Sequence, residues 1–160
     1  MNQNYLTLEI ATLDFNTLLS DWSWLINESC TPLIMNTFGD LFLQDHVGMI
    51  HLLDIDAGCT SKIADNIDIF GDMLDDKNCI DQWFMPGLVY TLHCHSMKLK
   101  PGQCYGYKIP PSLNGRSVPW NIRLTDLHMH YALLGRMHAQ FKLMPIEIEI
   151  GSLQEVNPGQ

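Results

Sequence analysis

Three short apolar segments, separated by tight turns, restrict the fold more than any other feature of the chain. LFLQD at 41–45, MIHLLDID at 49–56 and CTSKIA at 59–64 each have the length and composition of a β-strand. The segments DHVG and DAG that join them have the glycine and aspartate content of turns. Strands joined by such short turns pair as antiparallel hairpins, because parallel strands need a crossover of a dozen or more residues. The middle of the chain therefore predicts an antiparallel sheet.

Helical periodicity precedes and follows this sheet in the sequence. In 12–26, apolar residues recur at steps of three and four, and Thr12 or Asp14 is suited to cap the helix. Pro86 interrupts another helical pattern and should begin a new turn or a kink there. The expected helices are 12–26, 67–76, 80–99 and 126–141, and further short strands are expected at 104–109, 121–126 and 147–150. This order indicates an α+β fold with helices packed around an antiparallel sheet, and the length of 160 residues predicts one domain over 1–160.

Charge is distributed unevenly along the chain, whose net charge is −9. Residues 40–81 hold ten aspartates against two lysines, whereas residues 93–142 hold seven bases against one aspartate. The acidic middle would repel phosphates, which argues against nucleic acid as the main ligand. It would attract a basic protein and speed the encounter with it, although a plain solubilising surface has the same composition. The candidate contacts with such a partner are Asp68, Asp72, Asp75 and Asp76, on the outer face and end of the helix expected at 67–76.

The sequence also bears on the compartment. No run of 18 apolar residues is present, and the first residues lack the basic and apolar regions of a secretory signal. The five cysteines are odd in number and widely spread, without a CxxC pair, which is typical of reduced thiols. We therefore expect a cytoplasmic protein that does not act at a membrane.

No familiar catalytic or cofactor motif is present. The sequence lacks GxGxxG, GxxxxGK[ST], GxSxG and HExxH, and no cofactor or metal is expected. His93 and His95 would point about 200° apart on a helix. His130 and His138 would lie roughly 12 Å apart on the last helix. Neither pair suits zinc, which needs four converging ligands.

Asp54 and Asp56 alternate on a predicted strand and so would share one face. They could serve as a glycosidase-like carboxylate pair, but capping of the turn before Gly58 is the favoured interpretation. The chain is thus expected not to be an enzyme. The alternative is a small-molecule-binding or metal-assisted enzyme that uses the histidine-rich C-terminal region together with Tyr105 and Tyr107.

The stretch PGQCYGYKIPPSLNG at 101–115 combines rigid, aromatic and charged residues. Its PG should end the preceding helix, CYGYKI should be a strand, and PP and NG should form a rigid exit and a turn. Tyr105 and Tyr107 would alternate onto one face, with Gly106 admitting another backbone and Lys108 pointing the opposite way. Packing against the core is the favoured interpretation. The second is direct contact of Tyr105, Tyr107 and Lys108 with a protein partner, because rigid aromatic side chains bind at low entropic cost.

Motifs spread over about 15–145 resemble one known family. They are DWSWLI, PLIMNTFGDLFLQD, MIHLLDIDAG, LKPGQCYGYKIPPSLNG and DLHMHYALLGRMHAQ. Together they resemble the Tdi-type immunity proteins, which neutralise DNase effectors of the bacterial type VI secretion system. Arg136 and Asn114 depart from the family pattern, and the residues that match it are Gly39, Asp40, Gly102, Tyr105, Gly106, Lys108, Pro110, Pro111, Gly115, His130, Gly135, His138 and Gln140.

The resemblance implies a cytoplasmic, non-enzymatic inhibitor that binds a cognate toxin, a nuclease domain. The segment at 40–66 is also similar to the wider SUKH-like group of immunity proteins, which implies a SUKH-like α+β fold. A nuclease that grips DNA is usually basic around its site, and an acidic partner complements it. The charge distribution agrees with this implied partner.

Overall fold

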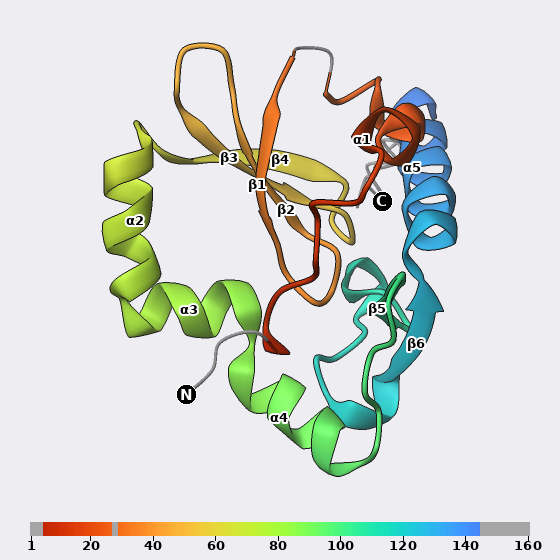
Figure 1. Cartoon of the computed structure of the whole chain (residues 1–160). Coiled ribbons are helices and arrows are strands. Elements are labelled where there is room, and N and C mark those ends of the chain that lie inside the picture. The colour runs from red at the N-terminus through yellow and green to blue at the C-terminus, as the bar shows by residue number, and fades with distance from the viewer. Residues whose placement is uncertain (1–4, 27–28, 145–160) are drawn as a thin grey trace, which may run out of the picture.

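Four antiparallel strands form the main sheet of the computed structural model, which describes residues 5–26 and 29–144 (Figure 1). They lie across the sheet in the order β1 (Thr31–Met35), β2 (Leu41–Gln44), β3 (Ile50–Asp54) and β4 (Cys59–Ala64). β2, β3 and β4 correspond to the three predicted segments, so the predicted antiparallel sheet is confirmed. β1 has no counterpart among the predicted strands. Its Pro32 cannot donate a hydrogen bond, and the register shifts between Pro32 and Ile34, as an edge strand tolerates.

A second sheet consists of β5 (Gln103–Tyr107) and β6 (Ile122–Asp126), which pair antiparallel with each other. The two predicted strands at 104–109 and 121–126 are thus present, but they do not join the main sheet. Tyr105 lies opposite Leu124, and its backbone N–H donates to the carbonyl of Thr37, 2.8 Å away, in the loop after β1. The strand predicted at 147–150 lies outside the described residues.

Three helices follow β4: α2 (Ile67–Asp75), α3 (Lys77–Phe84) and α4 (Pro86–Cys94). The side chains of Asn66 and Asp76 cap α2 and α3 by accepting backbone N–H groups of the first turn. Met85 between α3 and α4 has a φ of 48°, and Pro86 is the first residue of α4, which confirms the predicted break. The helix predicted to reach residue 99 ends five residues earlier, where Ser96 takes a φ of 61°.

The last helix, α5 (Leu127–Leu143), confirms the prediction for 126–141, and Asp126 caps it. The predicted helix 12–26 is instead divided into α1 (Phe15–Leu18) and a 3-10 turn, Ser20–Trp22. Asp14 is the cap of α1. The change of helix type places Trp22 under α5, where its indole N–H donates to the carbonyl of Tyr131, 3.0 Å away.

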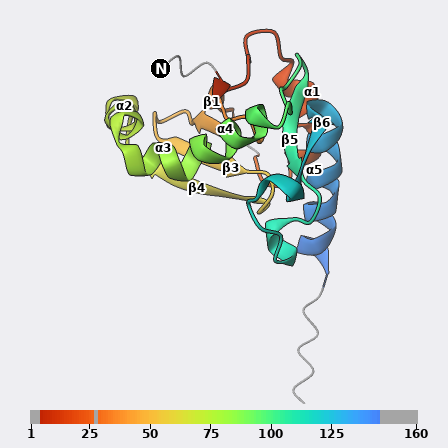
Figure 2. The same ribbon diagram turned by 90° about the horizontal axis from the view of Figure 1, so that it is seen from below.

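Helices cover the sheet on two sides, and α2 and α5 lie at opposite sides of the molecule (Figures 1 and 2). β2 shows why this is possible, because its side chains alternate between two hydrophobic clusters. Phe42 packs with Phe70 and Trp83 of the helices α2 and α3. Leu41 and Leu43 belong to the cluster that α5 covers. This arrangement confirms the α+β class, while the SUKH-like comparison and the single domain stay predictions.

No helix in the described ranges is both long and apolar enough to cross a membrane.

Candidate functional site

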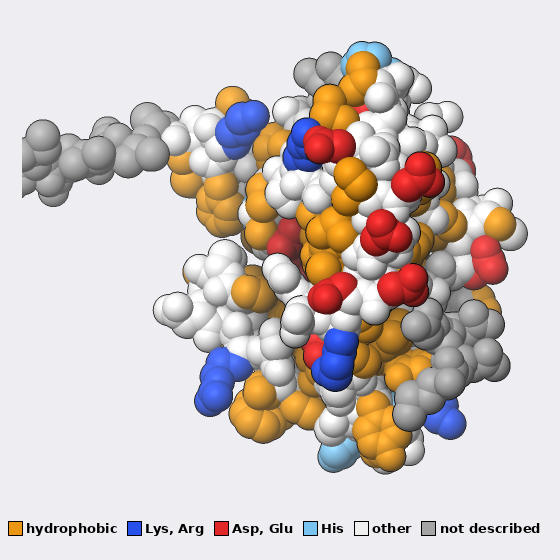
Figure 3. Space-filling model, turned by 90° about the vertical axis from the view of Figure 1, so that its left-hand side faces the viewer, with side chains coloured by type: hydrophobic (Ala, Val, Ile, Leu, Met, Phe, Trp, Pro, Cys, Tyr) orange, Lys and Arg blue, Asp and Glu red, His pale blue; other side chains and the backbone are white. Residues whose placement is uncertain are grey.

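Four aspartates form an exposed acidic face on α2 and at its junction with α3: Asp68, Asp72, Asp75 and Asp76. Figure 3 looks at this side of the molecule, where acidic side chains gather among apolar and uncharged ones. Ile67 and Ile69 of α2 are themselves 47% and 41% exposed, and Phe70 is the buried residue of the helix. Asp76 also has a local task, because its carboxylate accepts the backbone N–H groups of Asn78 and Cys79. The acidic face therefore offers charge and apolar area together.

The two tyrosines of β5 lie in the core. Tyr105 and Tyr107 are 0% and 8% exposed, and both rings pack against Phe38 at centroid distances of 5.4 and 5.8 Å. The Tyr105 hydroxyl donates to the carbonyl of Met97, and the Tyr107 hydroxyl lies 3.1 Å from Oγ of Ser117. The structure thus places both rings on one face, as expected, and inside the core. This burial favours the packing interpretation for both rings.

Lys108 lies on the surface, and its ammonium donates to the carbonyl of Trp120, 2.8 Å away. The loop around it presents apolar side chains to solvent: Leu113 and Trp120 are each 70% exposed and Ile109 is 55% exposed. Of the three candidate contacts on 105–108, Lys108 is therefore the one with an exposed side chain.

The rigid exit after β5 is a closed loop. Pro110 accepts the backbone N–H groups of Leu113 and Gly115, and Pro111 opens a short 3-10 turn. A Cβ on Gly115 would lie 1.7 Å from the carbonyl oxygen of Ile109, so that position requires glycine. Asn114, which departs from the family pattern, has a φ of 63°. Asparagine tolerates this conformation better than other residues with a side chain, so the departure leaves the turn intact.

The motif on α5 lies mostly inward. His130 and His138 are 5% and 9% exposed, whereas Gln140 is exposed. Nε2 of His138 lies 3.1 Å from the carbonyl oxygen of Ile55. The ring of His130 lies against Gly106, where a Cβ would be 3.1 Å from Cε1. The close approach expected at Gly106 is thus made by a side chain and not by another backbone.

Glycines of the motif mark where other elements meet α5. The Tyr131 hydroxyl of α5 donates to the carbonyl of Gly39, and the first N–H of the helix, that of Leu127, donates to the carbonyl of Gly102. Gly39 and Gly102 have φ angles of 95° and 80°. Gly135 lies against the backbone of Asp21. The motif residues on α5 and at these glycines therefore hold the helix to the rest of the fold.

The two buried histidines of α5 do not face a common site. His130 and His138 point to different packing partners, Gly106 and Ile55. Within residues 5–26 and 29–144, no group of three or more His, Cys, Asp or Glu side chains could hold a metal ion. Burial raises the pKa of the Cys104 thiol well above its ordinary value, so this cysteine is not an activated nucleophile.

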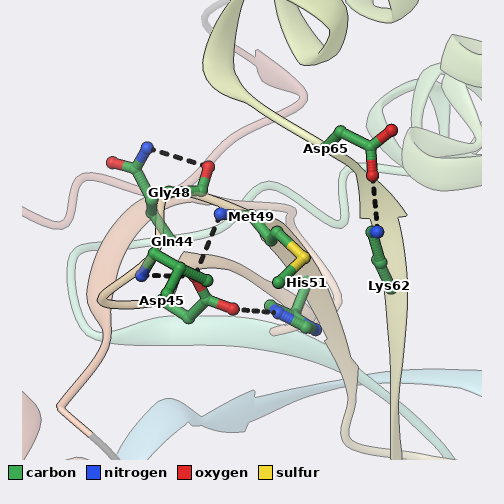
Figure 4. A network of polar contacts seen from close by, with 8 residues as sticks. Gln44, Asp45, Gly48, Met49, His51, Lys62 and Asp65 are labelled. Atoms are coloured by element: carbon green, nitrogen blue, oxygen red, sulfur yellow. Dashed lines mark hydrogen bonds and ion pairs between the residues drawn. The ribbon is translucent and has the colours of Figure 1, made fainter.

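Aspartates lie at both ends of the β2–β3 hairpin, and their hydrogen bonding differs between the two ends. At the tight turn after β2, one oxygen of Asp45 accepts the N–H groups of Val47 and Met49, and the other lies 2.8 Å from Nε2 of His51 (Figure 4). These contacts, the His51 hydrogen bond first, lower the pKa of Asp45. Lys62 and Asp65 form a further ion pair of 2.5 Å nearby.

At the opposite end of the hairpin, three aspartates meet around a cavity of about 190 Å³. We call it the carboxylate pocket, and its lining residues are Phe38, Asp40, Leu52, Asp54, Asp56, Gln82, Trp83, Met85, Tyr107 and Pro111. Asp40 accepts hydrogen bonds from the Ile55 backbone N–H and the Asn36 amide, and Asp54 accepts one from the Ala57 N–H. Asp54 thus caps the turn before Gly58, as predicted, whereas Asp56, for which the same role was predicted, accepts no hydrogen bond from the described residues of this turn.

Asp56 is the exceptional member of the carboxylate pocket. It is 8% exposed, and no described residue donates a hydrogen bond to it or pairs with it as a cation. Burial, followed by the charge of Asp40, raises the pKa of Asp56 to about 8. Burial and the charge of Asp54 raise the pKa of Asp40 to about 7. Burial and mutual repulsion therefore favour the protonated forms of Asp40 and Asp56 in the folded state.

The proximity of Asp40 and Asp54 follows from the pairing register of β2 and β3, and their spacing along the sequence does not reveal it. Leu41 pairs with Leu53 in the β2–β3 register, so Asp40 and Asp54 fall opposite each other one position further along. Asp40 appears in the sequence only as a residue of the family motif, 14 positions before Asp54. Once the hairpin register is fixed, the proximity follows.

A larger cavity, about 550 Å³, lies between the N-terminal segment and the turn before β5, with Thr37, His93, Lys98 and Lys100 among its lining residues. The buried hydroxyl of Thr37 has no hydrogen-bond partner among the described residues. The size of this cavity alone does not indicate a function. None of the aspartates of the acidic face or of the carboxylate pocket lines it.

Comparison with known proteins adds the family. No curated protein matches the chain. The family model described as "T6SS immunity protein Tdi1, C-terminal" matches residues 64–138, just under half of the chain, from the end of β4 into α5. The matched stretch contains the acidic face, the loop after β5 and the motif of α5 up to His138. Residues 64–138 therefore belong to the Tdi1 C-terminal family of type VI secretion immunity proteins.

Proposed function

We propose that this immunity protein binds and neutralises a cognate type VI secretion effector that is a basic DNase domain, in the cytoplasm and without catalysis. The observation that carries the proposal is the acidic face: Asp68, Asp72 and Asp75 are exposed on one helix. They repeat at steps of four and three residues, where like charges weaken a helix. Because these carboxylates repel one another, a positively charged partner that binds them would relieve the repulsion.

The position of Asp75 strengthens this argument. It is the last residue of α2, where the helix dipole favours a cation and disfavours a carboxylate. The surrounding surface offers apolar area as well, through Ile67 and Ile69. Charge that steers a partner, next to apolar area that holds it, is the usual composition of a protein interface. Lys108 and the exposed apolar loop around it are proposed as a secondary contact.

The alternative, a metal-assisted or small-molecule enzyme built on the histidines of α5, has less support. His130 and His138 are engaged in packing, and Tyr105 and Tyr107 are buried in a different part of the core. No observation brings these four side chains together around one substrate. A binding protein requires no such assembly.

The test is direct binding between the purified chain and a catalytically inactive form of the nuclease effector encoded next to its gene. A stable complex is expected, and the chain should suppress DNA cleavage by the active effector at a one-to-one ratio. A complex without suppression would contradict the neutralising role. Suppression of a toxin that does not cleave DNA would contradict the nuclease assignment.

A further inference from the structure

The carboxylate pocket leaves the carboxyl group of Asp56 without a hydrogen-bond donor within the described ranges, unlike the opposite end of the hairpin. Asp45 at the other end has two backbone donors and a histidine around its carboxylate. Asp56 has no described donor, although it is 92% buried and lines the cavity. A mostly buried carboxyl group without a hydrogen-bond partner is unfavourable in the free protein, so its retention points to a partner that arrives from outside.

The walls of the pocket indicate what kind of partner fits. Trp83, Tyr107 and Phe38 supply aromatic surface, and Asp40, Asp54 and Asp56 supply the charge. Aromatic rings and carboxylates together bind organic cations, through cation–π contact and charge-assisted hydrogen bonds. A bare metal ion is not suggested, since the described residues contain no group of ligands with the required geometry.

The size of the pocket favours a side chain over a free small molecule. Its volume of about 190 Å³ lies below the roughly 300–1,000 Å³ that small-molecule sites occupy. Gln82 and Pro111, both exposed, belong to its lining, so the cavity reaches the surface between α3 and the loop after β5. Met85, at the α3–α4 junction, lines it with a backbone φ of 48°, a conformation that costs energy for a residue other than glycine.

We propose that the carboxylate pocket receives an arginine side chain of the effector. This inference rests on the proposed function and names one anchor of the complex. The planar guanidinium presents five N–H donors, which suits Asp40 and Asp56 together better than the compact ammonium of lysine does. The methylenes of the arginine lie against the aromatic wall. The pocket and the acidic face are separate contacts, the first for a single inserted group and the second for a charged surface.

The first experiment uses the isolated protein and a blocked arginine, N-acetyl-L-argininamide, as the probe. NMR titration should show saturable shifts of the Trp83 indole N–H, assigned with Trp83→Phe. N-acetyl-L-citrullinamide, which has the same shape without the charge, should give no saturable shift. Asp56→Asn should abolish the response to argininamide, whereas Asp65→Asn, a charge change on the exposed surface, should keep it. Absence of a saturable shift in the parent protein overturns the inference.

The second experiment uses the complex. Asp56→Asn should weaken binding of the inactive effector by about thirtyfold or more, as loss of a buried charge contact does. The variant should melt no lower than the parent, because it removes a repelled carboxylate, so the weakening cannot be attributed to unfolding. Equal affinity of the variant and the parent would overturn the arginine anchor while leaving the proposed function in place. Failure of the parent to bind the effector would instead refute the proposed function.

Discussion

Gly135, in the middle of α5, lies directly against the backbone of Asp21. A Cβ at this position would be 2.7 Å from the carbonyl oxygen of Asp21 and 2.9 Å from Nε1 of Trp22. Neither atom can move easily, since one is backbone and the other donates a hydrogen bond to Tyr131. The N-terminal segment and the last helix are therefore in contact at a distance that excludes any side chain.

Gly135→Ala should consequently destabilise the fold. Overpacking of this kind costs about 1–3 kcal/mol. Gly71→Ala is the matched control, because Gly71 also lies within a helix but has no atom within 4 Å of a new Cβ. Relief of glycine's entropy cost should raise the stability of that variant by about 0.5–1 kcal/mol. Urea denaturation of both variants measures the difference, and equal midpoints would show that the contact at Gly135 is soft.

Replacement of Tyr105 should reveal its place in the core. Tyr105→Ala should lower the free energy of unfolding by about 3–5 kcal/mol, because the ring is fully buried. Tyr105→Phe should cost about 1 kcal/mol, since it removes only the hydrogen bond to Met97. Lys108→Ala, on the surface of the same segment, should melt close to the parent. A Tyr105→Ala variant with parental stability that fails to protect cells would instead make the segment a recognition surface.

The stability of the free protein should fall as pH rises from 6.5 to 8. The pKa values of Asp40 and Asp56 are raised to about 7 and about 8, so the folded state keeps protons that the unfolded chain has released. His130 partly offsets this fall near pH 6.5, because burial lowers its folded pKa to about 4 while the unfolded imidazole, with an ordinary pKa of 6.5, still carries part of its proton; the two aspartates together outweigh this single group. Asp54 and Tyr107, which also face the cluster, do not reverse this sign, because the Asp54 charge adds to the repulsion and burial raises the Tyr107 pKa.

Melting temperatures at pH 6.5, 7.2 and 8 measure this dependence. Asp56→Asn should flatten it, since the amide cannot ionise, while Asp65→Asn should retain the parental slope. An unchanged slope in Asp56→Asn would mean that another group titrates in this range.

Reversal of charge on the acidic face should slow association with the effector. Asp72→Lys combined with Asp75→Lys should reduce the association rate about tenfold at low salt. The reduction should shrink at physiological ionic strength, where exposed charges are screened within about 8–10 Å. Both replacements relieve repulsion along α2, so the fold should be retained. Asp76 is left unchanged, because it caps α3.

Glu9→Lys, a charge reversal on an exposed residue outside the acidic face, is the control for general electrostatics. Stopped-flow measurements over a series of salt concentrations give the rates. If the double variant associates as the parent does at every salt concentration, the acidic face does not steer the partner.

The fold was predictable from sequence wherever local patterns and tertiary packing agree. The strands at 41–64, the break at Pro86 and the final helix follow from turn residues and periodicity. β1 was not predicted because Pro32 disfavours a strand. At the edge of a sheet, a proline is tolerated because its missing N–H would not be needed for pairing. The prediction of one continuous helix over 12–26 was wrong, because the burial of Trp22 beneath α5 outweighs the helical periodicity of this segment. The carboxylate pocket needed the register of β2 and β3, which spacing along the chain does not contain.

The family match begins at Ala64, the last residue of β4. Asp40, Asp54 and Asp56 therefore precede the matched stretch, while Trp83, Met85, Tyr107 and Pro111 fall within it. A single genetic crossover near codon 64 would exchange the three aspartates of the pocket together with Phe38, and would keep Trp83 and Tyr107. If the pocket anchors the effector as proposed, such an exchange offers a one-step evolutionary route to a new toxin preference, because the recombined chain would keep both α2 and α5 while it presented a different group to the incoming side chain.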